Sequence, residues 1–268
     1  MNEQVSLERV FLAPQEQDAL IEVGAEALRI VNENYGTGYP HYNGGHEGGL
    51  AYHNQHHSLA VARGSARVAG RLGLGAVEVM TAEQAGAAHD IIQQKPRGIM
   101  ERESAEWYAE QLQARGLPRA VIEAGSLAIL GTEPTFDEQF RLTGQVVNQL
   151  EFPSRSAELV ARSVACADFS ELYEPIGPYL GHRLYQQIKV TSPHQEPPLD
   201  DLVGFQRNQV WLLNNYEYPH QAGEEVFGRL RGPVTEHAER VLQKLEAGEI
   251  HSWQQLLDND LAFAARHA

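Results

Sequence analysis

Cysteine, long apolar runs and positive charge are all scarce in this chain of 268 residues. Cys166 is its single cysteine, so an internal disulfide is excluded and a reducing compartment, the cytoplasm by default, is expected. The chain has no run of about 18 apolar residues, which predicts that nothing crosses a membrane. Its first residues lack the charged-then-apolar layout of a signal peptide.

Basic residues are outnumbered by acidic ones. Lys and Arg together number 21 against 36 Asp and Glu, which gives a formal net charge of −15. A nucleic-acid polymer needs a basic face to neutralise its phosphates, so we expect no such partner. A small anionic substrate, held by a metal ion and a few local Arg or Lys residues, is compatible with this charge.

Helical periodicity runs through almost the whole chain and predicts an all-α bundle. We find no alternating pattern that predicts a strand, and residues 36–50 are rich in Gly, which predicts a long loop. Pro residues at 191–199 predict a boundary between a domain over 1–195 and a helical extension over 196–268 that packs back onto it. The predicted helices span 15–34, 52–71, 81–94, 101–115, 117–131, 136–149, 154–172, 176–189, 200–215, 221–246 and 252–267.

His and Asp residues gather in three places within the predicted helices. His53 and His57 are four residues apart, which places them on one helix face. The adjacent pair His89-Asp90 and the later Asp168 lie among small or apolar residues, where a charged Asp is costly to bury unless it is paired or metal-bound. From these fragments the fold could gather two imidazoles and two carboxylates around one metal ion. An ion held in this way, with open coordination positions, could activate water.

Each fragment taken alone has a simpler interpretation. The first could be a surface His cluster, because His56 also lies in it. The second could be a His and an Asp at a helix end, and Asp168 could pair with an Arg or cap a neighbouring helix. The metal-site hypothesis therefore depends on all three fragments meeting in the fold.

The order His…His-Asp…Asp resembles the HD-domain superfamily of metal-dependent phosphohydrolases. The string Tyr52-His53-Asn54-x-x-His57 is similar to the first motif of its phosphodiesterase-like branch, and Ala87-Ala88-His89-Asp90-Ile91 resembles the motif that names the superfamily. Two further strings resemble a group of predicted bacterial HD phosphohydrolases: Glu101-x-Glu103-Ser104-Ala105 and Leu130-Gly131-Thr132. The resemblance covers roughly residues 20–190 and implies an HD-domain helical bundle.

The resemblance implies that His57, His89, Asp90 and Asp168 are the ligands of one divalent metal ion. Mn, Fe, Zn, Co, Ni and Mg are all compatible with these ligands. Relatives with two metals take further His ligands between the His-Asp pair and the last Asp, and this chain has no His from 90 to 181. A single metal follows unless Glu101 or Glu103 contributes, and two-iron redox chemistry is disfavoured.

The resemblance also suggests catalytic residues. His53 resembles the residue that protonates the leaving oxygen, although it could instead support or replace a ligand. Asp90 would orient the attacking water as well as bind metal. Glu103 is a candidate base, with an exposed Glu at a helix start as the alternative. The general base stays open, because Gln93 and Gln94 stand where some relatives place a catalytic Glu.

Candidate substrate-binding residues come from three segments. Asn54 could orient a neighbouring ligand or simply cap its helix. Cationic help for a phosphate could come from the loop after His-Asp, with a solvated basic loop as the alternative. We expect His182 to be structural or exposed, and the Gly-rich loop, with Tyr39, His41, Tyr42, His46 and Glu47, to form either a lid or a disordered segment. The substrate-binding candidates are Asn54, Lys95, Arg97, Tyr179 and Arg183, with Arg102 as a further basic residue.

Taken together, these features predict a metal-dependent phosphohydrolase that acts on a small phosphate ester, with nucleotides among the candidates. Mono- and diesterase activity are both compatible with the sequence. The alternative is an HD-fold protein that binds a nucleotide or metal without turnover, as a sensor or scaffold. The sequence predicts neither the substrate, the metal nor the oligomeric state.

Overall fold

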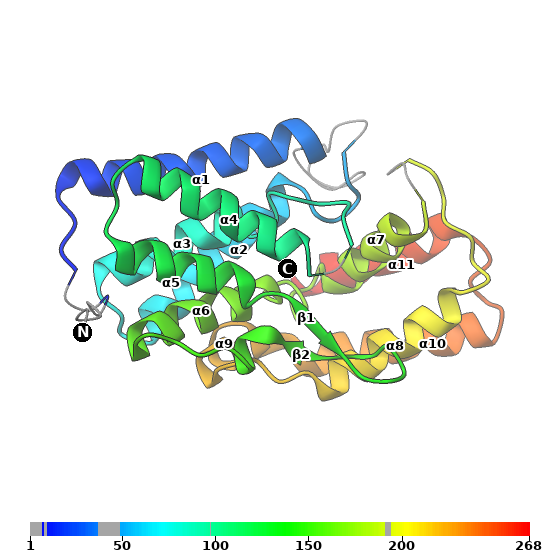
Figure 1. The fold of residues 1–268 in the computed structure, drawn as a ribbon. Helices are drawn as coiled ribbons and strands as arrows, with labels where there is room; N and C mark the ends of the chain where they lie inside the picture. The colour runs from blue at the N-terminus through cyan, green and yellow to red at the C-terminus, as the bar shows by residue number, and fades with distance from the viewer. Residues whose placement is uncertain (1–6, 8–9, 37–48, 97, 191–193) are drawn as a thin grey trace.

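The computed structural model describes residues 7, 10–36, 49–96, 98–190 and 194–268, and this part of the chain is mostly helical (Figure 1). The fold therefore agrees with the predicted helical bundle. The elements are α1 Pro14–Tyr35, α2 Gln55–Arg71, α3 Ala76–Ala88, α4 Met100–Ala114, α5 Arg119–Leu130, β1 Pro134–Phe136, β2 Leu142–Gln145, the 3-10 helix η2 Val146–Asn148, α6 Arg155–Asp168, α7 Gly177–Lys189, α8 Leu202–Asn215, α9 Gln221–Phe227, the 3-10 helix η3 Gly228–Leu230, α10 Arg231–Glu246 and α11 Trp253–His267.

Helix α2 lies at the centre of the bundle, packed against α3 and α6, while α5 packs against α4 and α6. Small residues make the α2–α3 contact close. A Cβ at Gly86 would lie 2.7 Å from Oγ of Ser65 and 3.1 Å from the Cα of Ala62, so a larger residue would need the two helices to shift. This close approach brings the end of α3 next to the start of α2, and both carry His residues of the predicted site.

The predicted helix over 136–149 is wrong, because the structure has an antiparallel hairpin of β1 and β2 there, with Pro134 opposite Gln145. Asp137 organises its turn: Oδ1 accepts hydrogen bonds from the backbone N–H groups of Gln139 and Arg141, both at 2.9 Å. An Asp that binds the backbone of its own turn competes with helix formation. Phe140 adopts a φ of 58°, which a helix does not allow.

The predicted helix over 221–246 is also divided, into α9, η3 and α10. Gly228 follows α9, and Pro233 lies in the first turn of α10, where its missing N–H leaves no hydrogen bond unmade. A helix can therefore begin there but could not run through it.

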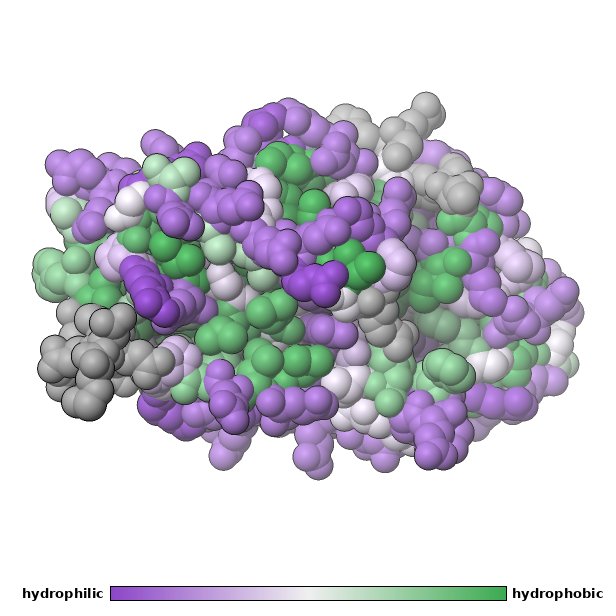
Figure 2. Space-filling model, in the orientation of Figure 1, coloured by the Kyte–Doolittle hydropathy of each residue, from purple (hydrophilic) through white to green (hydrophobic). Residues whose placement is uncertain are grey.

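Two apolar clusters hold the helices together. The larger includes residues from Leu7 to Phe263, and the smaller joins Tyr179 and Leu180 of α7 to Trp253 and Leu257 of α11. Side chains on both sides of residue 195 take part in each, and the division into 1–195 and 196–268 stays a prediction. Hydrophilic side chains cover most of the face in Figure 2, with smaller apolar groups between them. None of the helices in the described ranges has the length and apolar character needed to cross a membrane.

Candidate metal centre

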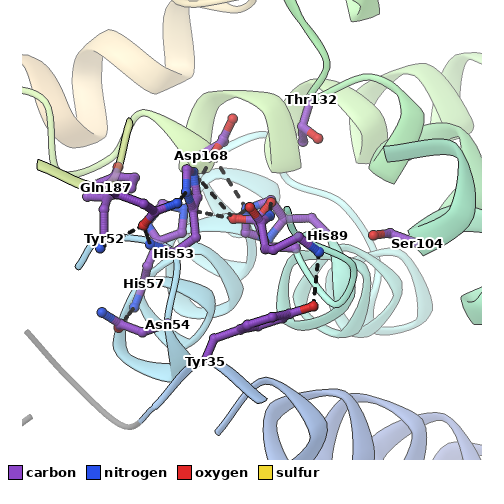
Figure 3. A network of polar contacts seen from close by, with 12 residues as sticks. Tyr35, Tyr52, His53, Asn54, His57, His89, Ser104, Thr132, Asp168 and Gln187 are labelled. Carbon is purple, nitrogen blue, oxygen red and sulfur yellow. Dashed lines mark hydrogen bonds and ion pairs between the residues drawn. The ribbon is translucent and has the colours of Figure 1, made fainter. Parts of the chain in front are cut away.

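The three His and Asp fragments meet at one place in the bundle, where the side chains of His57, His89 and Asp168 point toward one another (Figure 3). His57 lies in the first turn of α2, and Asp168 is the last residue of α6. Helix α3 ends at Ala88, so His89 caps it and Asp90 lies in the turn that follows. The prediction that His-Asp lies within a helix is therefore wrong by one or two residues.

The four predicted ligands converge through one atom each. Nε2 of His57 lies 3.5 Å from both Oδ2 of Asp90 and Oδ1 of Asp168. Nε2 of His89 lies 3.1 Å from Oδ2 of Asp90 and 3.4 Å from Oδ1 of Asp168. Two nitrogens and two oxygens thus surround one point from three elements of the fold.

The donor atoms themselves fit a cation. Nε2 of His57, Nε2 of His89 and Oδ2 of Asp90 are buried and make no hydrogen bond within the described part of the chain. Buried polar atoms without partners are costly in an otherwise satisfied core. Imidazole nitrogens and carboxylate oxygens are ordinary ligands of divalent metals. This buried His/Asp group can therefore hold a metal ion.

The far nitrogen of each ligand His is held by an acceptor. Nδ1 of His57 lies 3.2 Å from Oε2 of Glu171, and Nδ1 of His89 lies 2.8 Å from the carbonyl oxygen of Gly86. An acceptor at Nδ1 places a proton there and leaves the lone pair of Nε2 facing the centre. Sequence reasoning missed Glu171, although its position three residues after Asp168 was a usable signal.

The charges in the centre are balanced by protons in the absence of a cation. Burial lowers the pKa of His57, but the nearby carboxylates of Asp168 and Glu171 more than offset this, and its pKa lies at about 9. Burial likewise lowers the pKa of His89, and Asp90 and Asp168 raise it well above the ordinary value. The pKa values of Asp90 and Asp168 are lowered, because their His neighbours outweigh burial. A bound cation would take the place of these protons.

His53 lies just before α2, at the edge of the centre. Its Nε2 is 3.9 Å from Oδ2 of Asp90, its ring contacts those of Tyr52 and His57, and a quarter of its side chain is exposed. Burial lowers its pKa. Asn54, the next residue, is fully buried, and its Oδ1 accepts hydrogen bonds from the backbone N–H groups of His56 and His57, as expected of a helix cap.

The remaining predicted residues come from the segment after Asp90, from α7 and from the Gly-rich loop. Lys95 and Glu103 form an ion pair with each other and are partly exposed. On α7, Arg183 is buried 6.0 Å from the ring of Tyr179, and burial lowers the pKa of its guanidinium. Arg97 and the lid candidates in the Gly-rich loop lie outside the described residues. Glu101 is buried, and burial raises the pKa of its carboxyl.

Three glutamine amides support the centre. Nε2 of Gln93 donates to Oδ1 of Asp90 at 2.7 Å, and Nε2 of Gln145 donates to Oδ2 of Asp168 at 3.1 Å. Gln187 contacts Nδ1 of His53 at 2.7 Å. Sequence reasoning missed Gln145 and Gln187, because neither belongs to a motif and each reaches the centre only through the fold.

No model of a protein family matches the chain, and no curated protein matches it in sequence. Its structure is similar to Bacillus subtilis YpgQ in complex with ADP, with a TM-score of 0.53 and 13% identity over 88% of this chain and 97% of that one. It also aligns with a Lactobacillus plantarum protein, with a TM-score of 0.42 and 16% identity over 96% and 93% of the two chains. At this identity the likeness to YpgQ shows a shared fold.

Proposed function

We propose that the chain is a metal-dependent phosphohydrolase of the HD-domain type that acts on a small phosphate ester. The convergence of His57, His89, Asp90 and Asp168 on one buried point carries this proposal. The fold shared with a protein that was solved with ADP supports a nucleotide as the substrate class. We expect no nucleic-acid polymer as a partner.

These four residues would hold one divalent ion, and their ligand types admit Mn, Fe, Zn, Co, Ni or Mg. When bound, such an ion supplies Lewis acidity toward a phosphoryl oxygen and toward water. Asp90 orients the attacking water, since the amide of Gln93 fixes its carboxylate at 2.7 Å. His53 faces the same space through Nε2 and donates to the leaving oxygen.

Substrate charge would be balanced from α7 and from the loop after Asp90. Arg183 and Tyr179 lie on one face of α7, which also carries the contact with His53. Lys95 would need to leave Glu103 to reach a phosphate, and Glu103 would need to leave Lys95 to act as a base. Arg97 remains a candidate from the sequence.

The non-catalytic alternative is supported by one observation. Gln93 occupies a position where some relatives place a catalytic Glu, and its amide donates to Asp90 and cannot take a proton from water. A protein that binds a nucleotide or a metal as a sensor would have no need of a base there.

Hydrolysis of a substrate panel separates the two functions. The panel holds nucleoside mono-, di- and triphosphates, cyclic nucleotides and an aryl phosphodiester, each with added Mn, Co, Ni, Zn or Mg. His89→Ala and Asp90→Ala are compared with wild type, and His251→Ala, on an exposed residue, is the control. Metal-dependent turnover that disappears in both site variants and survives in the control supports the hydrolase. One tightly bound metal without turnover supports the sensor.

A further inference from the structure

The side chain of Gln187, on α7, contacts Tyr52 and His53 at the edge of the candidate metal centre (Figure 3). Its Oε1 accepts hydrogen bonds from the backbone N–H groups of Tyr52 and His53, at 2.9 and 3.0 Å. Its Nε2 lies 2.7 Å from Nδ1 of His53. One amide therefore binds both the backbone and the ring of the same histidine.

The two backbone contacts fix which end of the amide faces the ring. A backbone N–H can only donate, so the atom that meets both N–H groups must be the carbonyl oxygen. Reversing the amide would place its NH₂ group against two donors and leave all of them without acceptors, which is costly for partly buried groups. The end of Gln187 that faces His53 is therefore the NH₂ group.

The orientation of the amide determines where the ring carries its proton. Because the NH₂ group of Gln187 donates, Nδ1 of His53 must accept, and the proton of the ring lies on Nε2. Nε2 points into the centre, 3.9 Å from Oδ2 of Asp90. This distance exceeds that of a hydrogen bond, so Asp90 does not accept the proton.

We propose that Gln187 is a positioning residue that keeps His53 neutral with its proton on Nε2, from where the ring donates a hydrogen bond to the leaving oxygen of the substrate. The assignment of the leaving oxygen rests on the proposed function, whereas the assignment of the proton rests on the contacts of Gln187 alone. Tyr179, Arg183 and Gln187 recur at every fourth residue of α7 and so share one face of it. The helix that carries the candidate phosphate-binding residues thus also sets the tautomer of His53.

NMR of protein labelled with ¹⁵N in its His rings, loaded with diamagnetic Zn²⁺, tests the position of the proton directly. We expect the shifts of a ring protonated at Nε2 for His53 in wild type. In Gln187→Glu the carboxylate can accept from the backbone and from Nδ1–H at once, so Nδ1 should carry a proton. Gln209→Glu, on α8, is the matched control and should keep the Nε2–H form.

Two results would overturn the proposal: an Nδ1–H ring in wild type, or an unchanged tautomer in Gln187→Glu. If Gln187→Glu does not fold, Gln187→Met replaces it, because Met keeps the length of the side chain without donating. With that variant we expect a mixture of both tautomers, and a pure Nε2–H ring would contradict the role of the amide.

Kinetics with two aryl phosphodiesters then connects the tautomer to catalysis. A phenyl leaving group depends more on a hydrogen bond to its oxygen than a 4-nitrophenyl group does. Gln187→Met should therefore lower kcat for the phenyl ester in proportion to the fraction of Nε2–H ring lost in the spectrum, with a smaller loss for the nitrophenyl ester and little change in KM. Equal losses for both esters would contradict the positioning role. If wild type hydrolyses no substrate, the proposed function fails, and the spectrum still decides the tautomer.

Discussion

Within the described residues, two groups of buried His and Asp side chains differ in how their polar atoms are satisfied. In the candidate metal centre, three ligand atoms make no hydrogen bond within the described part of the chain. In the second group, between α7, α10 and α11, His182 lies 2.6 Å from one oxygen of Asp260 and His237 lies 2.9 Å from the other.

One more side chain, Gln206, forms hydrogen bonds within the second group. Oε1 of Gln206 lies 2.8 Å from Nε2 of His182, and its Nε2 donates to the carbonyl oxygen of Ala238 at 2.9 Å. In each contact a donor faces an acceptor, so none of these atoms is left without a partner. Residue type alone therefore does not distinguish the two groups. The unpaired buried ligand atoms of the candidate metal centre do, and His182 is buried and paired.

The largest effect that separates the two groups comes from removing the Asp of each. Asp260→Ala leaves two His residues buried without their counter-charge, which should lower the free energy of unfolding by about 3–5 kcal/mol. The folded fraction should still bind one metal per chain. Asp90→Ala should instead abolish metal binding. Urea unfolding and metal analysis of the folded protein measure both. Loss of metal in Asp260→Ala at full folding would contradict the comparison.

A smaller effect is expected at Glu171, which contacts the ring of His57 in the candidate metal centre. Glu171→Ala removes the acceptor at Nδ1 of His57, which orients the ring and fixes its proton. Loss of such a partner typically weakens metal binding by about 10–100-fold. Competition with a chelator of known affinity measures the change, with Glu196→Ala, on an exposed residue, as the control. An unchanged affinity in Glu171→Ala would mean that the ring is held by its packing instead.

The four candidate ligands could be named from the sequence because the resemblance to the HD-domain superfamily rests on short strings of rare residue types. For His57, His89, Asp90 and Asp168 to converge, it remained only that the predicted helices meet. The exact end of α3 could not be predicted, because Ala88, His89 and Asp90 all fit a helix locally. After Asp90 the backbone N–H groups of Ile92 and Gln93 instead donate to the hydroxyls of Ser104 on α4 and Tyr35 on α1, which are far away in the sequence.

The supporting residues could not be predicted in the same way. Gln145 reaches Asp168 from the hairpin, and its Oε1 accepts a hydrogen bond from the hydroxyl of Tyr216 at 3.3 Å, far along the chain. The sequence predicts a helix over 136–149 and therefore does not predict a contact made from a hairpin. Gln187 lies on a correctly predicted helix, but only the packing of α7 beside Tyr52 brings its amide to His53.

The smallest expected effect is the pH dependence of stability, and it concerns the second group, around Asp260. Burial lowers the pKa of His182, but Asp260 and Gln206 more than offset this and raise it above its ordinary value of 6.5. Burial raises the pKa of Asp260, and its two His partners lower it further than burial raises it. The stabilisation by His182 is therefore complete below about pH 6.5 and is lost as the pH rises through its raised pKa. That of Asp260 is present above about pH 4 and is lost as the pH falls through its lowered pKa.

These signs predict how His182→Gln should compare with wild type. The difference in the free energy of unfolding between the two proteins should be largest near pH 6 and should shrink as the pH rises through the raised pKa of His182 in the wild type. Urea unfolding of both proteins with bound metal, at a series of pH values from 6 upward, measures it. The metal centre is the same in both proteins, so its own titration cancels in the difference. A difference that is constant or grows with pH would mean that His182 is neutral in the fold and that Asp260 is held by hydrogen bonds alone.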